Sequence, residues 1–382
     1  MKKLLCVLLY LCIASAVAGQ DSTNIRKFFM NGYVKDMQTL SLDSSFKNAE
    51  WGNLIHNRVN FKWKPSEKVT GAAEVRSRIF YSNAADIPAA SIAARSENEY
   101  LDMQEVWVNT HTVVFTSNVE RLYLDYRTDK FNIRFGRQRI NWGMATTWNP
   151  NDIFNSYNFL DFDYEERPGV DGIKMKYLTG NTSSLEFAYA HARTTYGNTA
   201  ALKYAFNKWN YDFQLISGIY YNKPTVGMGW TGYIADAGFK GEMQYFFAGS
   251  DSTGHLNITL ETDYKFAREW YTDFGILYNN YGLSKPLNMA NVIDLNLSPK
   301  NLMPTKWNLI FTVTKQFSPR FSANTTLLFS PGTNFFILFP SLNYNVFTNL
   351  DLDIFWQSFF AKVRNEFLAM RHLGFIRVKF SF

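Results

Sequence analysis

Apolar and polar residues alternate along much of this chain, in segments long enough to cross a membrane as β-strands. Residues 121–127 place Leu122, Leu124 and Tyr126 on one face of an extended chain and polar residues on the other. The same pattern recurs in segments 53–64, 70–81 and 255–266. A strand that crosses a bilayer within a barrel needs about 9–11 residues, with one face toward lipid and the other toward the interior. The alternation therefore predicts an all-β fold, a transmembrane antiparallel β-barrel.

Eighteen segments fit this pattern in whole or in part. They are 29–42, 53–64, 70–81, 121–127, 130–141, 169–177, 184–192, 200–206, 211–221, 228–234, 238–247, 255–266, 270–281, 307–315, 321–329, 335–345, 350–360 and 373–382. Tight connections such as 207–210 alternate with long ones at 82–118, 142–168, 282–306 and 361–372. Short periplasmic turns and long extracellular loops are typical of outer-membrane barrels. Because 100–115 fits either a strand extension or an added hairpin, we expect 16–18 strands.

The beginning of the chain is typical of an exported protein. Two lysines precede an apolar run at 4–18, and small residues stand before Gly19, so we predict a cleaved secretory signal peptide over 1–19. The barrel then occupies 20–382 as a single domain. Cys6 and Cys12 both lie within the signal, so the mature chain is expected to contain no disulfide, no thiol nucleophile and no thiolate metal site.

The end of the chain is typical of the closing strand of such a barrel. Apolar residues alternate with polar ones up to Phe382, and an aromatic end suits a membrane interface. The alternation turns Arg377 and Lys379 toward the interior. We expect the barrel-assembly machinery to recognise this strand, and outer-membrane lipid and lipopolysaccharide to surround the barrel.

Composition agrees with a membrane barrel. Aromatic residues make up 17% of the chain, and the net charge of the whole chain is only +6, which does not indicate a nucleic-acid partner. After the signal, no stretch approaches the roughly 20 apolar residues of a spanning helix. A secreted β-sandwich array or solenoid is the soluble alternative, but no repeat of fixed period is visible.

Basic residues gather at the expected inward positions of the first strands. They are Arg58, Arg76, Arg78, Arg121 and Arg134. Rings of arginine and lysine in a pore favour anions, which makes this group a candidate basic wall of the lumen. The alternative is that these side chains pair with acids such as Glu74 and Asp125. Later strands are more acidic or neutral, with the acids Glu242, Glu261, Asp263, Asp273, Asp351 and Asp353. A basic wall that faces an acidic one would put a transverse field across the pore.

The loop after the segment 130–141 is rich in aromatic, amide and acidic residues. Three groups of residues stand out along it: Gly136, Arg137, Gln138, Asn141, Trp142 and Gly143, then Asn149, Pro150, Asp152 and Phe154, then Arg167, Pro168, Gly169 and Asp171. Such a loop can pack on itself or fold into the lumen. Asn149 or Asn151 would cap a short helix that begins near Pro150.

This loop resembles a family of porin-like, largely uncharacterised outer-membrane barrels of Gram-negative bacteria. The shared motif is GRQxxNWG, followed by NPxDxF and then RPGxD. The resemblance implies an outer-membrane barrel and solute passage, and it implies no substrate and no catalytic residue. The motif residues either build the loop or form a constriction, and we favour a structural role in which Arg137 or Arg167 bridges Asp152 or Asp171.

Other chemistry is weakly indicated. Asp161, Asp163, Glu165 and Glu166 crowd one loop, but their spacing does not fit an EF-hand, so calcium stays open. The five histidines form no zinc-binding pair, and no GxSxG or phosphate-binding motif occurs. We therefore expect no cofactor and no metal, and we do not expect an enzyme.

The sequence favours a porin-like channel of the cell outer membrane for passive passage of small solutes, anionic or dipolar in character. One alternative is a narrow or plugged barrel that serves adhesion or surface structure. The other is an outer-membrane lipid or ester hydrolase. The sequence leaves open whether the chain forms a homo-oligomer.

Overall fold

The computed structural model describes residues 27–83, 99–155, 168–193, 197–249, 253–286, 298–363 and 366–382. The predicted signal peptide at 1–19 lies outside these residues, so its cleavage stays a prediction. In the described residues, the only helical element is the short 3-10 turn η1 (Ala267–Glu269). No helix in the described ranges is long and apolar enough to span a bilayer.

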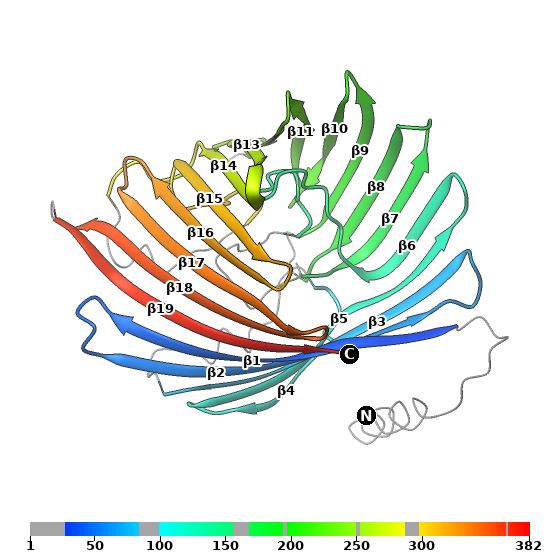
Figure 1. Ribbon diagram of the computed structural model, residues 1–382. Helices are drawn as coiled ribbons and strands as arrows, with labels where there is room; N and C mark the ends of the chain where they lie inside the picture. The colour runs from blue at the N-terminus through cyan, green and yellow to red at the C-terminus, as the bar shows by residue number, and fades with distance from the viewer. Residues whose placement is uncertain are drawn as a thin grey trace.

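Nineteen strands in the described part of the chain form one antiparallel sheet (Figure 1). They are β1 (Phe28–Asp43), β2 (Ala49–Trp63), β3 (Val69–Ser82), β4 (Gln104–Asn109), β5 (Val113–Arg127), β6 (Phe131–Gln138), β7 (Val170–Leu178), β8 (Ser184–His191), β9 (Thr199–Lys208), β10 (Tyr211–Tyr220), β11 (Lys223–Ile234), β12 (Ala237–Phe246), β13 (His255–Phe266), β14 (Trp270–Asn279), β15 (Trp307–Ser318), β16 (Phe321–Ser330), β17 (Phe335–Phe347), β18 (Leu350–Val363) and β19 (Glu366–Ser381). The pairing of β1 with β19 closes the sheet into a barrel.

Eighteen of these strands encircle the barrel, which confirms the upper end of the predicted range. The exception is β4. One edge of β5 pairs with β3. On the other edge, the first half of β5 pairs with β4 and the second half pairs with β6. The hairpin alternative for 100–115 is therefore correct.

The two ends of the barrel differ in their connections. Both described chain ends lie at one end, where short turns such as 64–68 and 235–236 join the strands; we call it the turn rim. The opposite end, the loop rim, carries the connections 83–103, 139–169 and 280–306. At the predicted turn 207–210, Trp209 and Asn210 have φ angles of 56° and 62°, as a two-residue hairpin turn requires.

The connection predicted at 361–372 is wrong. β18 continues to Val363 and β19 begins at Glu366, so the two strands pair almost to their tips. Outward aromatic side chains support this extension, since the rings of Phe360 and Phe367 stack at 5.9 Å. Cross-strand aromatic pairs stabilise a hairpin that the alternation pattern alone did not indicate.

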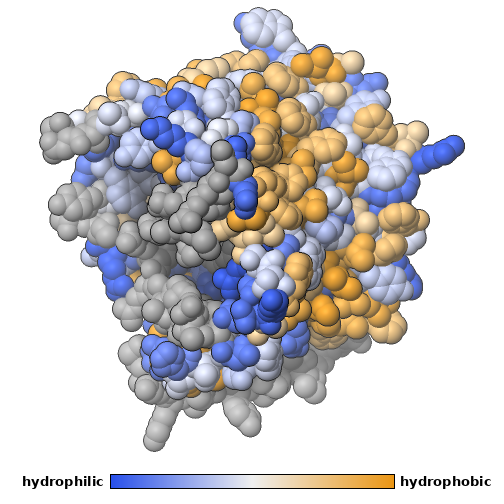
Figure 2. Space-filling view, turned by 90° about the vertical axis from the view of Figure 1, so that its left-hand side faces the viewer, coloured by the Kyte–Doolittle hydropathy of each residue, from blue (hydrophilic) through white to orange (hydrophobic). Residues whose placement is uncertain are grey.

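The outer surface of the barrel is apolar and its inner surface is polar. Leu122, Leu124 and Tyr126 are 47, 57 and 43% exposed, whereas Arg121 and Asp125 on the opposite face of the strand are buried. Figure 2 shows the apolar side chains as a broad orange belt, beside a region where hydrophilic side chains gather. Lipid on the outside explains this inversion of the usual soluble pattern.

Aromatic pairs border the belt on both sides. The rings of Phe28 and Trp63 stack at 6.4 Å near the turn rim, and those of Trp51 and Tyr81 meet at 5.3 Å toward the loop rim. Aromatic girdles at these positions mark the two membrane interfaces of an outer-membrane barrel. The strand segments between the girdles therefore face hydrocarbon.

Adjacent residues on β15 provide a test of the two faces. Phe311 points outward in the middle of the strand, and the hydroxyl of Thr312 meets that of Thr326 at 3.0 Å on the inner side. We expect Phe311→Arg to lower the free energy of unfolding in phospholipid vesicles by about 2–4 kcal/mol, because the charge enters hydrocarbon. Thr312→Arg is the control and should change it far less. Equal losses in denaturant titrations would contradict the assignment of faces.

Candidate functional site

The loop that follows β6 lies inside the barrel. In Figure 1 this teal segment runs within the ring of strands toward β14. Its path is fixed at several points of the inner wall. The indole Nε1 of Trp142 donates to Glu186 on β8, and the side-chain amide of Gln214 on β10 donates to the Trp142 carbonyl at 2.6 Å. The described part of this loop, 139–155, is here called the inner loop.

Two buried glutamates of the wall bind the backbone of the inner loop. Glu242 on β12 accepts from the N–H groups of Met144, Ala145 (2.6 Å) and Asn151 (2.9 Å). Glu261 on β13 accepts from the N–H groups of Thr146 (2.5 Å), Thr147 (2.8 Å) and Trp148 (3.4 Å). Hydrogen bonds to a charged acceptor contribute about 1.5–3 kcal/mol each. These two carboxylates therefore keep the inner loop against one side of the barrel.

The predicted helix near Pro150 does not form within the described residues, which end at Asn155 in this loop. Asn149 and Asp152 form only a turn, in which the Asp152 N–H donates to the Asn149 carbonyl at 3.1 Å.

Glycines on β11 leave room for the inner loop. A Cβ atom added at Gly227 or at Gly229 would lie 2.9 Å from the side-chain amide of Asn151. That amide donates to the Met228 carbonyl of the same strand at 2.9 Å. The loop side chain thus packs directly on the strand backbone, which only residues without a side chain permit.

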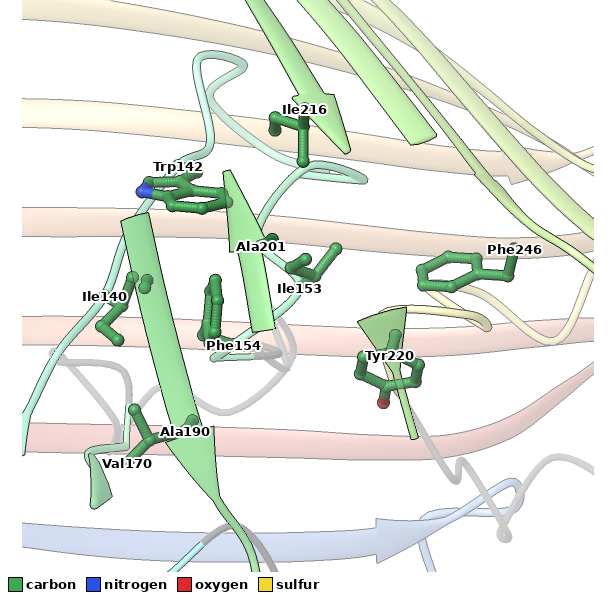
Figure 3. Packing of buried hydrophobic residues seen from close by; sticks show 11 residues of the cluster. Ile140, Trp142, Ile153, Phe154, Val170, Ala190, Ala201, Ile216, Tyr220 and Phe246 are labelled. Carbon is green, nitrogen blue, oxygen red and sulfur yellow. The ribbon is translucent and has the colours of Figure 1, made fainter. Parts of the chain in front are cut away.

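An apolar cluster seals the inner loop to the wall (Figure 3). Ile140, Trp142, Ile153 and Phe154 come from the loop. They pack on small or apolar inward residues of the wall, which include Ala190, Ala201 and Ile216. The rings of Trp142 and Phe154 meet edge to face at 5.0 Å. Apolar residues at inward positions of β8 to β10 are the sequence signal that indicates a loop packed inside.

Arg137 and Asp171 join the two ends of this loop. They are register partners on β6 and β7, and the guanidinium binds the carboxylate through two bonds of 2.9 Å. Arg137 also donates to Glu99 (2.9 Å), to the Val119 carbonyl (3.0 Å) and to the Leu101 carbonyl. All five N–H groups of a buried guanidinium are thereby satisfied. Of the predicted bridges, the pair Arg137–Asp171 is correct.

The remaining motif residues have local roles. Asn141 is exposed, and its side chain accepts from the Gly143 N–H at 3.3 Å. The amide of Asn149 donates to the Ala145 carbonyl at 2.5 Å, and Pro150 and Asp152 are buried. Arg167 lies outside the described residues, as do the acidic residues Asp161, Asp163, Glu165 and Glu166 of the open calcium prediction.

Residues 99–103 form a strap across the ends of three strands. The Leu101 N–H donates to Asp171 on β7 at 2.7 Å, and the Tyr100 ring meets His191 on β8 at 4.3 Å. Asp102 pairs with Arg193, just beyond β8, at 3.4 Å. The strap therefore reinforces the loop rim where β6, β7 and β8 are short.

A second segment, 298–306, also packs inside the barrel. The amide of Asn257 on β13 donates to the Lys300 carbonyl at 2.9 Å, and that of Asn279 on β14 donates to the Met303 carbonyl at 2.8 Å. Met303 shares an apolar cluster with Trp148 of the inner loop. The two inserted segments thus support each other on the wall from β8 to β16.

The opposite wall carries the predicted basic residues. Arg58 pairs with Glu74, Arg76 with Glu120 at 2.7 Å, and Arg134 with Asp125 at 2.8 Å. A β-bulge inserts Glu120 into β5, where Arg58, Arg76, Arg78 and Arg121 surround it. The pairing interpretation thus describes most of these contacts. Four arginines against Glu74 and Glu120 still leave this wall with a net positive charge.

Most of the acids on the later strands are bound to other groups. Glu242 and Glu261 are buried under the inner loop, Asp263 pairs with Lys240 at 3.0 Å, and Asp353 pairs with Arg377 at 2.8 Å. Asp351 accepts from the Asn345 amide at 2.7 Å, and Asp273 is buried. These contacts reduce the acidic charge that a transverse field would need.

A cavity of about 650 Å³ opens beside the basic wall at the turn rim. The charged residues that line it are Lys27, Lys62, Lys64, Lys68, Arg127 and Arg134, with the acids Glu67 and Asp125. Tyr123 and Phe29 add aromatic surface, and the Arg134 guanidinium lies 4.3 Å from the centre of the Tyr123 ring. The cavity continues the positive wall of β2 to β6 to the turn rim.

One histidine meets a serine, as a barrel hydrolase would require. The Ser358 hydroxyl lies 2.8 Å from Nδ1 of His372, and both residues are buried. The rings of Phe46 and Trp356 stack on His372 at 4.4 and 6.0 Å. In the described residues this pair carries no carboxylate neighbour at hydrogen-bonding distance, so it does not complete a Ser–His–acid catalytic group.

We predict that the two wall glutamates control access to the inner loop. In the double variant Glu242→Ala, Glu261→Ala, cleavage of the folded barrel by chymotrypsin after buried Trp148 should rise at least about tenfold, because several charged hydrogen bonds are lost. The fragment mass identifies the site. Asp353→Ala, which removes a buried carboxylate of β18 that pairs with Arg377, is the control. An unchanged cleavage rate in the double variant would contradict the anchoring role.

Glu99 should make the stability of the strap depend on pH. Burial raises the pKa of its carboxyl to about 7, although Arg137 opposes the shift. The folded chain then binds this proton more tightly than the unfolded chain, so the stability contributed by Glu99 falls as pH rises from about 4.5 to 7. Relative to Glu99→Gln, the parent should lose up to about 1.4 kcal/mol per pH unit in this window. Parallel pH profiles of the two unfolding free energies would contradict this prediction.

The barrel has the fold of outer-membrane porins. It is similar to the crystal structure of OpdQ from Pseudomonas aeruginosa, with a TM-score of 0.58 and 8% identity over 94% of this chain and 99% of that chain. It is also similar to OccAB3 and OccAB1 from Acinetobacter baumannii, with TM-scores of 0.61 and 0.59 and identities of 12 and 9%. Those matches cover 94% of this chain and 100 and 97% of the other chains. No protein-family model and no curated protein sequence matches the chain. The resemblance carried by the loop motif stays a prediction.

Proposed function

We propose that this protein is a channel of the cell outer membrane through which small solutes pass passively, with a preference for anions. The observation that carries the proposal is the asymmetric lumen. The inner loop is bound to one wall by Glu242 and Glu261, while the opposite wall from β2 to β6 remains basic and borders a cavity. A pore lined by arginine and lysine favours anions.

The proposal includes an orientation and partners. The turn rim faces the periplasm and the loop rim the exterior, which is the usual arrangement of these barrels. Lipid and lipopolysaccharide surround the belt. The last strand serves as the signal for the barrel-assembly machinery, since Phe382 exchanges two hydrogen bonds of 2.9 Å with Gly32 and so completes closure of the barrel.

The second candidate is a narrow barrel with a structural or adhesive role. It is favoured by the two inserted segments, 139–155 and 298–306, which occupy part of the interior. The hydrolase is less well supported, since Ser358 and His372 are buried by aromatic rings. Conductance separates the first two candidates, because only an open barrel passes ions.

We expect the purified protein to give single-channel steps in planar bilayers. In a potassium chloride gradient, the reversal potential should show a preference for chloride. The triple variant Lys62→Gln, Lys64→Gln, Lys68→Gln should shift the permeability ratio of anion to cation toward one, because these lysines line the cavity at the turn rim.

Lys47→Gln is the matched control, because it removes a positive charge from the exposed turn between β1 and β2 and not from the cavity. It should leave the reversal potential unchanged. A protein without single-channel steps would exclude the channel. An unchanged reversal potential in the triple variant would exclude the cavity lysines as the source of selectivity.

A further inference from the structure

Polar side chains interrupt the apolar belt on the outer face of β1 and β2. Asp36 and Gln38 are exposed on β1, whereas the residues between and before them on the strand are buried. On β2, Asn53 and Asn57 lie on the same outward face as the exposed Ile55. The register brings the two strands together, since Asp36 pairs with Ile55 and Gln38 with Asn53. We call Asp36, Gln38, Asn53 and Asn57 the polar patch.

The polar patch lies between the two aromatic girdles. The outward face of β2 runs through Trp51, Asn53, Ile55, Asn57, Val59, Phe61 and Trp63. Trp51 belongs to the girdle near the loop rim and Trp63 to the girdle near the turn rim. Asn53 and Gln38 are in register with Tyr81 of the girdle near the loop rim, whereas Asp36 and Asn57 lie further along the strands toward the middle of the belt. The Asp36 carboxylate and the Asn57 amide are therefore at the depth of the hydrocarbon.

A carboxylate and three carboxamides are poorly suited to lipid. Asp36 accepts from the Gln38 amide at 3.3 Å and from the Asn53 amide, and the Asn57 amide makes a long bond of 3.4 Å to the Tyr33 carbonyl. These bonds satisfy only part of the hydrogen-bonding capacity of four polar groups. Each group left without a partner in hydrocarbon costs several kcal/mol.

Two other strands of the belt lack such groups in the hydrocarbon region. The outward positions of β14 are Trp270, Thr272, Phe274, Ile276 and Tyr278, and those of β17 are Phe336, Leu338, Pro340, Leu342 and Tyr344. These strands present apolar side chains and one threonine hydroxyl to lipid. The contrast indicates that the wall of β1 and β2 is covered by something other than lipid.

We propose that the polar patch is the contact between two copies of this chain, which lie side by side in the membrane about a two-fold axis. In such a contact one surface meets itself, so it must both donate and accept hydrogen bonds. The patch does both, because its carboxamides donate and accept and Asp36 accepts. A head-to-tail contact would instead place the patch against the apolar belt of the neighbour and leave its polar groups unsatisfied.

The neighbouring strands favour a close approach of the second copy. On the adjacent strand β3, Ser77 is the register partner of Asn57. The hydroxyls of Ser77 and Ser117 form a hydrogen bond of 2.8 Å. The side chain beside Asn57 is thus short, while the Trp107 indole of β4 donates to the Ser117 hydroxyl at 3.0 Å and borders this low stretch on its far side. The proposed pair requires insertion in a membrane, but it does not depend on which solute the barrel passes or on whether the barrel conducts.

Disulfide crosslinking tests the contact, because the only cysteines of the sequence, Cys6 and Cys12, fall in the predicted signal peptide. Ile55→Cys places one thiol in the centre of the patch and leaves its polar groups intact. In native outer membranes this variant should form a disulfide-linked dimer on oxidation. Leu215→Cys, on the outward face of β10 at a similar exposure of 50%, is the control and should stay monomeric.

A second variant tests the polar basis of the contact. The double variant Asp36→Leu, Asn53→Leu places apolar side chains on a surface that can face lipid, so the barrel should still fold. Heat-modifiable mobility in gels will report folding. In detergent, light scattering should show a fall from two copies per particle to one. The proposal is overturned by a monomeric parent, by equal crosslinking at positions 55 and 215, or by a leucine variant that remains dimeric. Bilayer conductance of the same samples tests the channel separately.

Discussion

Closure of the sheet between β1 and β19 is the interaction on which the rest of this protein depends. Residues from Tyr33 to Asp43 pair with those from Ser381 to Arg371, and the reciprocal bonds between Gly32 and Phe382 extend the pairing to the last residue. In hydrocarbon an unpaired backbone N–H or C=O costs several kcal/mol, so an open edge is not tolerated. Closure gives the barrel an inner and an outer surface. Whether a strand residue is polar or apolar then depends on the surface on which it lies.

The enclosed interior creates the opposite problem, because inward polar groups and the inner loop must satisfy one another. The backbone of 144–151 has no helix or strand partner, and Glu242 and Glu261 have no cation at hydrogen-bonding distance among the described residues. The backbone N–H groups of the loop need acceptors and the two carboxylates need donors, so their hydrogen bonds fix the loop to the wall from β8 to β14. Acids that the sequence offered as pore-lining charge thereby become structural, and the basic wall opposite sets the charge of the lumen.

Arg137 connects the inner loop with the strap at the loop rim. It joins the ends of the inner loop through Asp171 and attaches the strap 99–103 through Glu99 and the Leu101 carbonyl. A buried guanidinium is stable only when all its donors are bonded, so loop and strap order each other. Two residues of the motif that resembles a porin-like family, Arg137 and Asp171, thus join the ends of the loop, while the lysines of the proposed anion preference belong to other strands.

The sequence by itself determined the barrel, the inward and outward faces and a range of 16–18 strands, because alternation with a period of two is a local property. It also offered Arg137–Asp171 as one of four possible bridges among the charged residues of the same loop. Only the tertiary structure decided that Glu242 binds Met144, a residue 98 positions away, and that the apolar residues of β8 to β10 receive Trp142 and Phe154. Such contacts depend on strand register and on the path of a loop across several strands, which no local pattern specifies. For the same reason the polar patch became visible only when pairing placed Gln38 beside Asn53.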